Sequence, residues 1–325
     1  MLISITPLRV SFFGGGTDFP EYFKKKKTRI IGTSINKSIY VTSSFCSPDE
    51  KIKYKLFYRE VEKIKKINSI KHSVIRKIFS KLKINQNLEL HFISDLPSFS
   101  GLGSSSSFSV GLANLLFYLK KKNFNKKQLS KFVINFERKD LNESVGFQDQ
   151  IFATYGGFNC INFNHSDFYV KNFSVNEDIK KIQSNSFLVN TGLKRKAIDI
   201  EKKKIKKINQ NVNYLNSIKS ISDEAYKYLK SGDLSKNFSY LLNDSWNQKK
   251  KLHENVTNIQ IENMYRKALA EGATAGKLLG AGNGGFLYFY VPRKNQNNFL
   301  SFFKNAIKIN FEEKGSRIIK TWKIY

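Results

Sequence analysis

Apolar and polar residues alternate along several stretches of the first hundred positions, and this alternation predicts β-strands. It covers the segment LISITPLRVSFF, which runs into three glycines, and β-like segments recur at 37–45, 52–58 and 88–97. β-Branched and aromatic residues, which strands favour, are frequent in them. The last segment places Leu88, Leu90 and Phe92 on one face and ends at a proline, as a half-buried strand does.

Other stretches have the spacing of helices. Apolar residues recur at helical intervals within 69–82, and 108–122 is a mostly apolar segment closed by lysines, whose charge suits a helix C-terminus. A second helix is expected at about 126–141. These helices alternate with the predicted strands, which indicates a mixed α and β architecture.

The pattern changes from about residue 185. A buried strand is predicted at 186–192, followed by a long amphipathic helix at 196–218 and another at 233–254. The segment 261–291 is interpreted as helix, glycine loop and strand, and a helix at 297–309 and a strand at 316–324 follow. Without internal repeats or a low-complexity linker, the chain is predicted to be α+β in two lobes, 1–180 and 181–325.

Composition sets the broad class of the protein. The chain has 325 residues, 40% of them hydrophobic, which is enough to bury a core. It has no run of about 18 apolar residues and no signal-peptide pattern, so a cytoplasmic protein without a membrane partner is expected. Cys46 and Cys160 lie in no metal-binding or disulfide pattern and are expected to be reduced thiols.

The formal net charge of +30 has two interpretations. Clustered lysines would indicate a nucleic-acid or anionic-membrane surface. Here the runs at 24–27, 120–122, 202–204 and 249–251 are dispersed along the chain, which favours lysines on solvated faces. No RRM, KH, zinc-finger or helix-turn-helix signature is present, so no nucleic-acid partner is expected.

The stretch PSFSGLGSSSSFSVG, at 97–111, lies between a predicted strand and a predicted helix. Free backbone N–H groups at the positive end of a helix dipole bind phosphate, and glycines allow close approach of the backbone. Serine hydroxyls there can cap the helix, contact phosphate or ligate Mg²⁺. An ordinary serine-capped helix after a flexible turn is the alternative.

Two familiar nucleotide motifs fit the chain poorly. The segment from Gly272 to Lys277 is one residue too short for a Walker loop, and Leu278 replaces the required hydroxyl residue. Gly280, Gly282 and Gly285 match G-x-G-x-x-G, but a helix is expected before them and a strand after them, the reverse of the dinucleotide fold. A serine hydrolase is also disfavoured, because the chain has no G-x-S-x-G elbow.

A further glycine loop lies at 7–20, where Arg9 belongs to a strand and Thr17 and Asp18 follow three glycines. A hydroxyl and a carboxylate after a tight turn suit the recognition of sugar hydroxyls. A β-turn with a local aspartate cap explains the same residues.

Taken together, the segments PLRVSFFGGGTD, PSFSGLGSSSS and KLLGAGNGGF resemble, in this order, the three motifs of the GHMP kinases. The resemblance spans essentially the whole chain. It implies a ribosomal-protein-S5-like N-terminal domain, a ferredoxin-like C-terminal domain and ATP-dependent phosphoryl transfer. The segments GGGTDFP, GFQDQIFATYGGFN and TGLKRKA resemble the branch that phosphorylates the anomeric hydroxyl of a heptose 7-phosphate. Another sugar kinase of the family, of the fucokinase type, is the alternative.

The resemblance also implies roles for individual residues. Asp149 and Arg9 would be catalytic, and Ser105 and Glu137 would ligate Mg²⁺; without the motif context, Glu137 could be a solvated helix residue and Asp149 a helix-start carboxylate. ATP phosphates would bind Ser100, Gly101, Leu102, Gly103, Ser104, Ser105 and Ser106. The sugar would bind Gly15, Gly16, Thr17, Asp18, Arg195, Gly282 and Asn283.

Three positions qualify this assignment. Many family members have glutamate at the place of Gly15, and glycine is common at the place of Asn283. Arg195, with Lys194 or Lys196, would hold the phosphate of the acceptor, because a guanidinium binds phosphate bidentately; a basic start to a long helix is the alternative. The expected ligands are therefore ATP, Mg²⁺ and a phosphorylated heptose, and the oligomeric state is left open, with a homodimer among the options.

Overall fold

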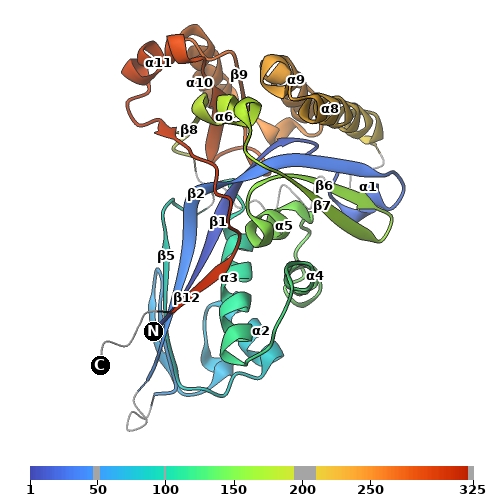
Figure 1. The fold of residues 1–325 in the computed structure, drawn as a ribbon. Coiled ribbons are helices and arrows are strands. Elements are labelled where there is room, and N and C mark those ends of the chain that lie inside the picture. Colours follow the sequence, from blue (N-terminus) through green and yellow to red (C-terminus); the bar gives the residue numbers. More distant parts are fainter. Residues whose placement is uncertain (47–51, 99, 194–209, 321–325) are drawn as a thin grey trace.

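The first lobe contains an eight-stranded sheet covered by helices (Figure 1). The computed structural model describes residues 1–46, 52–98, 100–193 and 210–320. The strands of this sheet are β1 (Leu2–Phe13), β2 (Thr28–Phe45), β3 (Tyr54–Phe57), β4 (Val61–Ile64), β5 (Leu88–Ser94), β6 (Phe158–Asn164), β7 (Asp167–Phe173) and β12 (Arg317–Lys320). The helices of this part are α1 (Pro20–Phe23), α2 (Ser73–Leu82), α3 (Ser104–Leu119), α4 (Lys126–Asn135) and α5 (Gln148–Tyr155).

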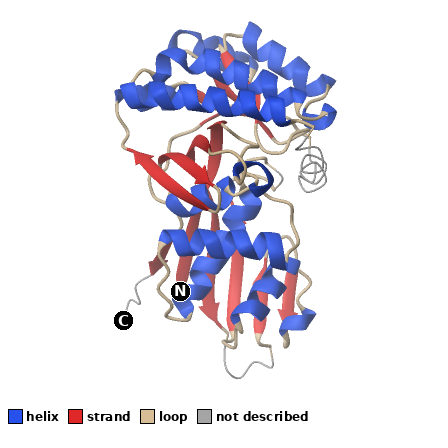
Figure 2. Cartoon of the chain, turned by 90° about the vertical axis from the view of Figure 1, so that its right-hand side faces the viewer, coloured by secondary structure: helices blue, strands red, loops and turns tan. Residues whose placement is uncertain are grey.

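Strand β2 organises the first sheet. Its 18 residues pair with β1 along most of their length, with β6 at the start and with β5 at the end. The strand order is β12-β1-β2-β5-β3-β4, and the hairpin β6-β7 joins β2. Helix α3 packs against β1 and β2, and Figure 2 shows helices of this lobe lying in front of the strands. Helix α5 also contacts β1, so this strand lies against two helices of the lobe.

The second lobe is built on the antiparallel sheet β11-β8-β10-β9. Its strands are β8 (Ser186–Asn190), β9 (Ala275–Leu278), β10 (Phe286–Tyr290) and β11 (Ile307–Lys308). Its helices are α6 (Glu177–Ser184), α8 (Val212–Ser231), α9 (Leu234–Lys251), α10 (Ile259–Ala270) and α11 (Gln296–Phe302). Phe289 of β10 packs with Trp246, Tyr265 and Phe299 in a core of its own.

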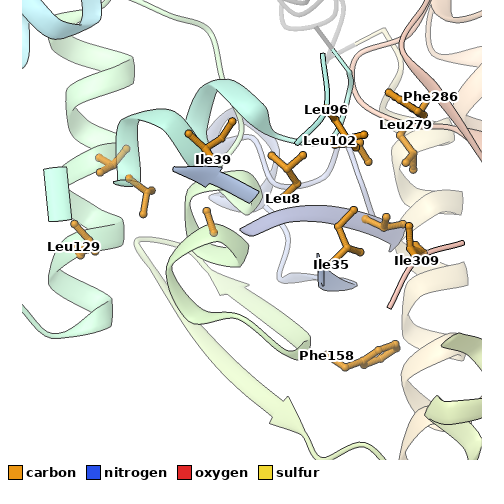
Figure 3. Close-up of a cluster of buried hydrophobic side chains, with 14 of the residues drawn as sticks. Leu8, Ile35, Ile39, Leu96, Leu102, Leu129, Phe158, Leu279, Phe286 and Ile309 are labelled. Atoms are coloured by element: carbon orange, nitrogen blue, oxygen red, sulfur yellow. The ribbon is translucent and has the colours of Figure 1, made fainter. Parts of the chain in front are cut away.

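A larger hydrophobic cluster joins the two lobes. Leu8 and Leu102 of the first lobe belong to the same buried cluster as Leu279 and Phe286 of the second. Figure 3 shows Leu96 and Leu102 beside Leu279 and Phe286. Because these leucines flank the second and third glycine segments, the cluster brings the two segments together.

The structure differs from the sequence-based expectations in three elements. Helix α3 begins at Ser104, so the four serines form its first turn and the loop ends at Gly103. The G-x-G-x-x-G segment follows a strand, β9, rather than a helix, and β10 comes next, so it joins an antiparallel hairpin. Strand β12 returns to pair with β1, so the C-terminal part of the chain completes the first sheet.

Four further expectations can be compared with the described residues, one of them only in part. Helix α8 begins at Val212, and the earlier part of the helix predicted at 196–218 lies largely outside the described residues. Cys46 and Cys160 are both buried. No helix in the described part of the chain is long and apolar enough to cross a bilayer. The predicted domain boundary at 180 falls inside α6 and stays a prediction.

Candidate active site

A partly buried ion pair joins β1 to the first turn of α5. Arg9 Nε donates to Asp149 Oδ1 and Arg9 Nη2 donates to Asp149 Oδ2, each at 2.8 Å. The Arg9 side chain is 5% exposed and that of Asp149 is 26% exposed. Two parallel N–H···O bonds fix both the position and the plane of the carboxylate. Asp149 is thus a rigid carboxylate with one side open.

The loop from Ser100 to Gly103 packs against this pair. Arg9 Nη1 donates to the carbonyl of Gly101 at 2.6 Å, and the Arg9 amide donates to that of Leu102 at 3.0 Å. Gly103 has a φ of +75°, and a Cβ there would lie 3.3 Å from both Arg9 Cγ and Asp149 Oδ2. Glycine at 103 therefore allows the loop to approach the carboxylate closely.

The second and third glycine segments are bonded to each other. The Phe286 amide donates to the carbonyl of Ser100 at 3.0 Å. A Cβ on Gly101 would lie 2.6 Å from the carbonyl oxygen of Leu279, and one on Gly280 would lie 2.6 Å from Gly101 Cα. The β9-β10 hairpin thus supports the loop that precedes α3.

The serines of the first turn of α3 face different ways. Ser107 is buried and donates to the carbonyl of Pro7 at 2.9 Å. Ser106 is also buried, and its hydroxyl donates to Glu137 Oε2 at 3.0 Å, whereas Ser105 is exposed. Gly103 is the N-cap and no side chain caps the helix, so the serines do not act as caps. The structure brings Ser106, rather than Ser105, against Glu137.

Glu137 lies in a π-helical turn, Phe136–Asp140, that continues α4. Its side chain is 1% exposed, and burial raises its pKa to about 7. The Gln150 side-chain amide also donates to Oε2, while Oε1 is buried and accepts no hydrogen bond of normal geometry. The Gln150 and Ser109 side chains partly offset the effect of burial on this pKa. Hard oxygen ligands with an open position suit Mg²⁺. The described residues include no group of three or more His, Cys, Asp or Glu that could hold a metal ion. A Mg²⁺ ion beside Glu137 would therefore take most of its ligands from outside the protein.

The first glycine loop contributes a second buried carboxylate, that of Asp18. Asp18 accepts hydrogen bonds from the Gly16 amide at 3.1 Å, the Gln148 amide at 3.1 Å and Gln148 Nε2 at 3.2 Å. Burial, and then the charge of Asp149, raises its pKa. Asp18 therefore ties the loop to the start of α5. Thr17, by contrast, bonds the carbonyl of Gly14 and the hydroxyl of Thr28 and is fully buried.

Two residues of the third glycine segment, which the sequence assigned to sugar binding, are instead used in contacts within the second lobe. Asn283 is 4% exposed; its amide donates to the carbonyl of Val256 and its side-chain oxygen accepts from Asn258. Gly282 packs against the Val256 backbone. Neither residue is among those that line the cavity. Arg195, the expected phosphate ligand, lies outside the described residues.

A cavity between the lobes is lined by Arg9, Asp149, Asp18 and the start of α3, but not by Glu137. Its lining comes from β1 and the loop after it, the start of α3, the segment before and within α5, and elements of the second lobe. The lining residues are Arg9, Ser11, Gly15, Gly16, Asp18, Phe19, Ser105, Ser106, Glu143, Val145, Gly146, Gln148, Asp149, Gln150, Asn211, Leu215, Lys249, Leu252, Lys277, Leu279, Gly280 and Ala281. A fixed carboxylate, a helix N-terminus and buried cations thus surround one space.

Two lysines of this lining were missed by the sequence analysis. Lys249 belongs to a run assigned to a solvated face, yet it is 9% exposed and donates to the carbonyls of Leu278 at 2.8 Å and Gly280 at 2.7 Å. Lys277 is 4% exposed and donates to the carbonyl of Phe12 at 2.7 Å. The sequence indicates a role for Lys277 only through its position directly before the glycine segment LLGAGNGG.

Comparisons with known proteins give the class. A family model described as GHMP kinases N terminal domain matches residues 68–157. The D-glycero-alpha-D-manno-heptose 7-phosphate kinase of Campylobacter jejuni is 31% identical, over 98% of this chain and 98% of its own length. The chain therefore belongs to the GHMP kinase family. It is an enzyme that transfers a phosphoryl group to an alcohol group, and the family uses ATP as the donor.

Solved structures agree on the fold. A D-glycero-D-manno-heptose 1-phosphate kinase from Bacteroides thetaiotaomicron is similar with a TM-score of 0.81 at 21% identity, covering 99% of this chain and 100% of that one. Galactokinase from Lactococcus lactis has a TM-score of 0.76 at 17% identity, covering 98% and 95%. The α+β GHMP kinase fold predicted from the sequence is confirmed.

Proposed function

We propose that this enzyme transfers the γ-phosphoryl group of ATP to the anomeric hydroxyl of D-glycero-D-manno-heptose 7-phosphate. The product would be the 1,7-bisphosphate, on a route to nucleotide-activated heptoses for surface polysaccharides. The choice of acceptor is supported by the Campylobacter relative, which is named a heptose 7-phosphate kinase and aligns over nearly the full length of both chains.

The observation that carries the proposal is the Arg9–Asp149 pair at the cavity. Arg9 holds both oxygens of the carboxylate, so Asp149 can meet an acceptor hydroxyl without reorganisation. There it either removes the hydroxyl proton or orients the hydroxyl. An anomeric hydroxyl is more acidic than an ordinary alcohol, so a modest base is sufficient.

The nucleotide phosphates are assigned to the segment from Ser100 to Ser106. This segment leads into α3, a 16-residue helix whose positive dipole end and first N–H groups favour anions. Ser105 and Ser106 line the cavity beside this helix start. The assignment places the triphosphate next to the carboxylate that faces the acceptor.

Glu137 and Ser106 are the residues that would hold Mg²⁺, with Ser105 adjacent. The buried Oε1 of Glu137, which accepts no hydrogen bond of normal geometry, and the hydroxyl of Ser106 on the neighbouring oxygen fit a cation whose other ligands are nucleotide oxygens and water. When bound, Mg²⁺ neutralises charge that develops on the phosphoryl oxygens. Glu137 and Ser106 would keep that charge next to the start of α3.

The sugar is assigned to Gly15, Gly16 and Asp18, which line the cavity near Asp149. Arg195 stays the proposed ligand of the acceptor phosphate on sequence grounds. Thr17 and Asn283 are left out of the proposed set because their polar groups are used elsewhere in the fold. Gly282 is left out because it packs against the Val256 backbone and does not line the cavity. Cytoplasmic location and the oligomeric state remain sequence-based predictions.

Mass spectrometry of a reaction mixture tests the function. The protein, Mg²⁺ and ATP are mixed with heptose 7-phosphate, and a bisphosphate product is expected. A panel of sugars, including fucose, galactose and unphosphorylated heptose, separates this enzyme from a fucokinase-like relative. Phosphorylation of an unphosphorylated sugar in preference to heptose 7-phosphate would overturn the acceptor assignment while leaving the kinase class intact.

A further inference from the structure

Lys277 is a buried lysine of β9 that reaches the first lobe. It pairs with Tyr288 in the β9-β10 ladder, and its ammonium donates to the carbonyl of Phe12 at the end of β1. The residue is 4% exposed and lines the cavity that holds Arg9 and Asp149. An ammonium has three N–H donors, and Phe12 accepts one of them.

The charge of Lys277 is not compensated by the protein. Among the described residues, no carboxylate forms an ion pair with it, and the charged group that acts on it is Arg9, which has the same sign. A buried ammonium without an anionic partner is costly. Burial, and then Arg9, lowers the pKa of Lys277 to about 7. In the free enzyme, burial and Arg9 therefore favour the neutral amine above pH 7, and an anion bound beside it would favour the ammonium.

The other charged groups of the cavity are Arg9 of β1, Asp18 of the following loop, Glu143 before α5, Asp149 of α5 and Lys249 of α9, and all of these except Glu143 form hydrogen bonds within the protein. Arg9 and Asp149 bind each other, Asp18 is held by amides, and Lys249 donates to two carbonyls. Burial raises the pKa of Glu143, and Lys77 opposes this effect. An anion from the reactants is thus the partner that Lys277 lacks.

We propose that Lys277 is a cationic anchor for a phosphate oxygen of the bound reactants, and that binding is coupled to the uptake of a proton by its amine. This inference rests on the proposed kinase function. The oxygen belongs either to the transferable phosphate of ATP or to the phosphate of the acceptor. The proton comes from solvent and converts the neutral amine to the ammonium that donates to the oxygen. Lys277 thereby adds positive charge to the site only when a phosphate is present.

Calorimetric titration in two buffers of different ionisation enthalpy tests the coupling. One arm uses Mg²⁺ with the β,γ-imido analogue of ATP, and the other uses heptose 7-phosphate, with unphosphorylated heptose as its control. For a group that titrates near pH 7, proton uptake should approach about one per site at pH 8 and fall toward about zero at pH 6. The arm that shows the uptake identifies the source of the oxygen.

Two variants assign the proton. Lys277→Met should lose the uptake and bind the phosphate ligand about tenfold more weakly. Lys277→Arg should bind the phosphate ligand without proton uptake, because a guanidinium is always charged. If the methionine variant does not fold, the arginine variant alone tests the assignment of the proton. Uptake in both variants equal to that of the wild type, or no uptake by the wild type in either arm, overturns the inference. If no bisphosphate forms but the nucleotide arm shows Lys277-dependent uptake, the acceptor assignment fails and the anchor stands.

Discussion

Arg9 and Asp149 are 140 positions apart, and two hydrogen bonds of 2.8 Å hold the carboxylate of one in the plane of the guanidinium of the other. The same guanidinium donates to the carbonyl of Gly101. One side chain thus aligns the proposed acceptor-activating group with the proposed phosphate loop. This arrangement allows the roles of the two groups to be separated by mutation.

Asp149→Asn should reduce kcat by about 10²- to 10⁴-fold, the range typical of a lost general base or hydroxyl-orienting carboxylate. ATP binding should stay nearly unchanged, because the amide keeps the size of the side chain and the loop from Ser100 to Gly103 keeps its own contacts. Steady-state kinetics and titration with the ATP analogue measure the two quantities. Asp167→Asn, on the surface hairpin, is the control. Wild-type turnover in Asp149→Asn would remove this carboxylate from the mechanism.

Ser106→Ala and Glu137→Gln should each raise the Mg²⁺ concentration that gives half-maximal activity, by about tenfold, or about 1.4 kcal/mol. Ser105→Ala should have a smaller effect, because Ser106 is the serine that contacts Glu137. Activity measured across a Mg²⁺ titration distinguishes the two serines. If Ser105→Ala raised this Mg²⁺ concentration more than Ser106→Ala, Ser105 would be the metal ligand, as the sequence predicted.

The difference between Ser105 and Ser106 illustrates what sequence patterns do and do not determine. The alternation of 88–97 and the apolar helix after it were predictable, because periodicity reports which side of an element is buried. The choice of serine depends on where α3 starts, and consecutive helical residues point about 100° apart. Gly103 sets that start through a positive φ of 75°, which adapts the loop to Arg9 and Asp149.

Long-range contacts account for the other differences. The burial of Lys249 depends on two carbonyls that β9 and the following loop place about thirty positions further along the chain. The addition of β12 to β1 depends on a strand pairing between the two ends of the chain. The local sequence predicts neither the burial of Lys249 nor the pairing of β12 with β1, because both depend on residues that are distant in the chain.

Stability without Mg²⁺ should depend on pH through Glu137. The pKa of Glu137 in the folded protein, about 7, lies above its ordinary value of 4.5. The contribution of this residue to the free energy of unfolding is therefore complete below about pH 4.5 and decreases by about 3 kcal/mol as the pH rises through 7. Glu137→Gln should remove this loss and keep an acceptor for Ser106. Urea unfolding at pH 5 and pH 8 measures the effect, with the exposed Glu177→Gln as control. An equal effect of Glu137→Gln at both pH values would contradict it.

Arg195→Ala should weaken the binding of heptose 7-phosphate by about tenfold or more, because a guanidinium can bind phosphate bidentately. Binding of the ATP analogue should change little. Titration calorimetry with each ligand measures both affinities, and Arg293→Ala on the second lobe is the control. Equal losses for the two ligands would show that Arg195 does not recognise the acceptor phosphate.

Gly101→Ala should destabilise the protein and reduce kcat together, because it separates the two glycine segments. The new Cβ would lie 2.6 Å from the carbonyl oxygen of Leu279, at a φ of +75°. Gly232→Ala is the matched control, since Gly232 has a φ of +78° and no atom within 4 Å of its Cβ position. The control should lose about 1 kcal/mol for the backbone conformation, whereas Gly101→Ala should lose about 1–3 kcal/mol more for the overlap. Urea unfolding and turnover of both variants are compared; equal destabilisation, with activity kept in Gly101→Ala, would mean that the loop before α3 works without the support of the β9-β10 hairpin.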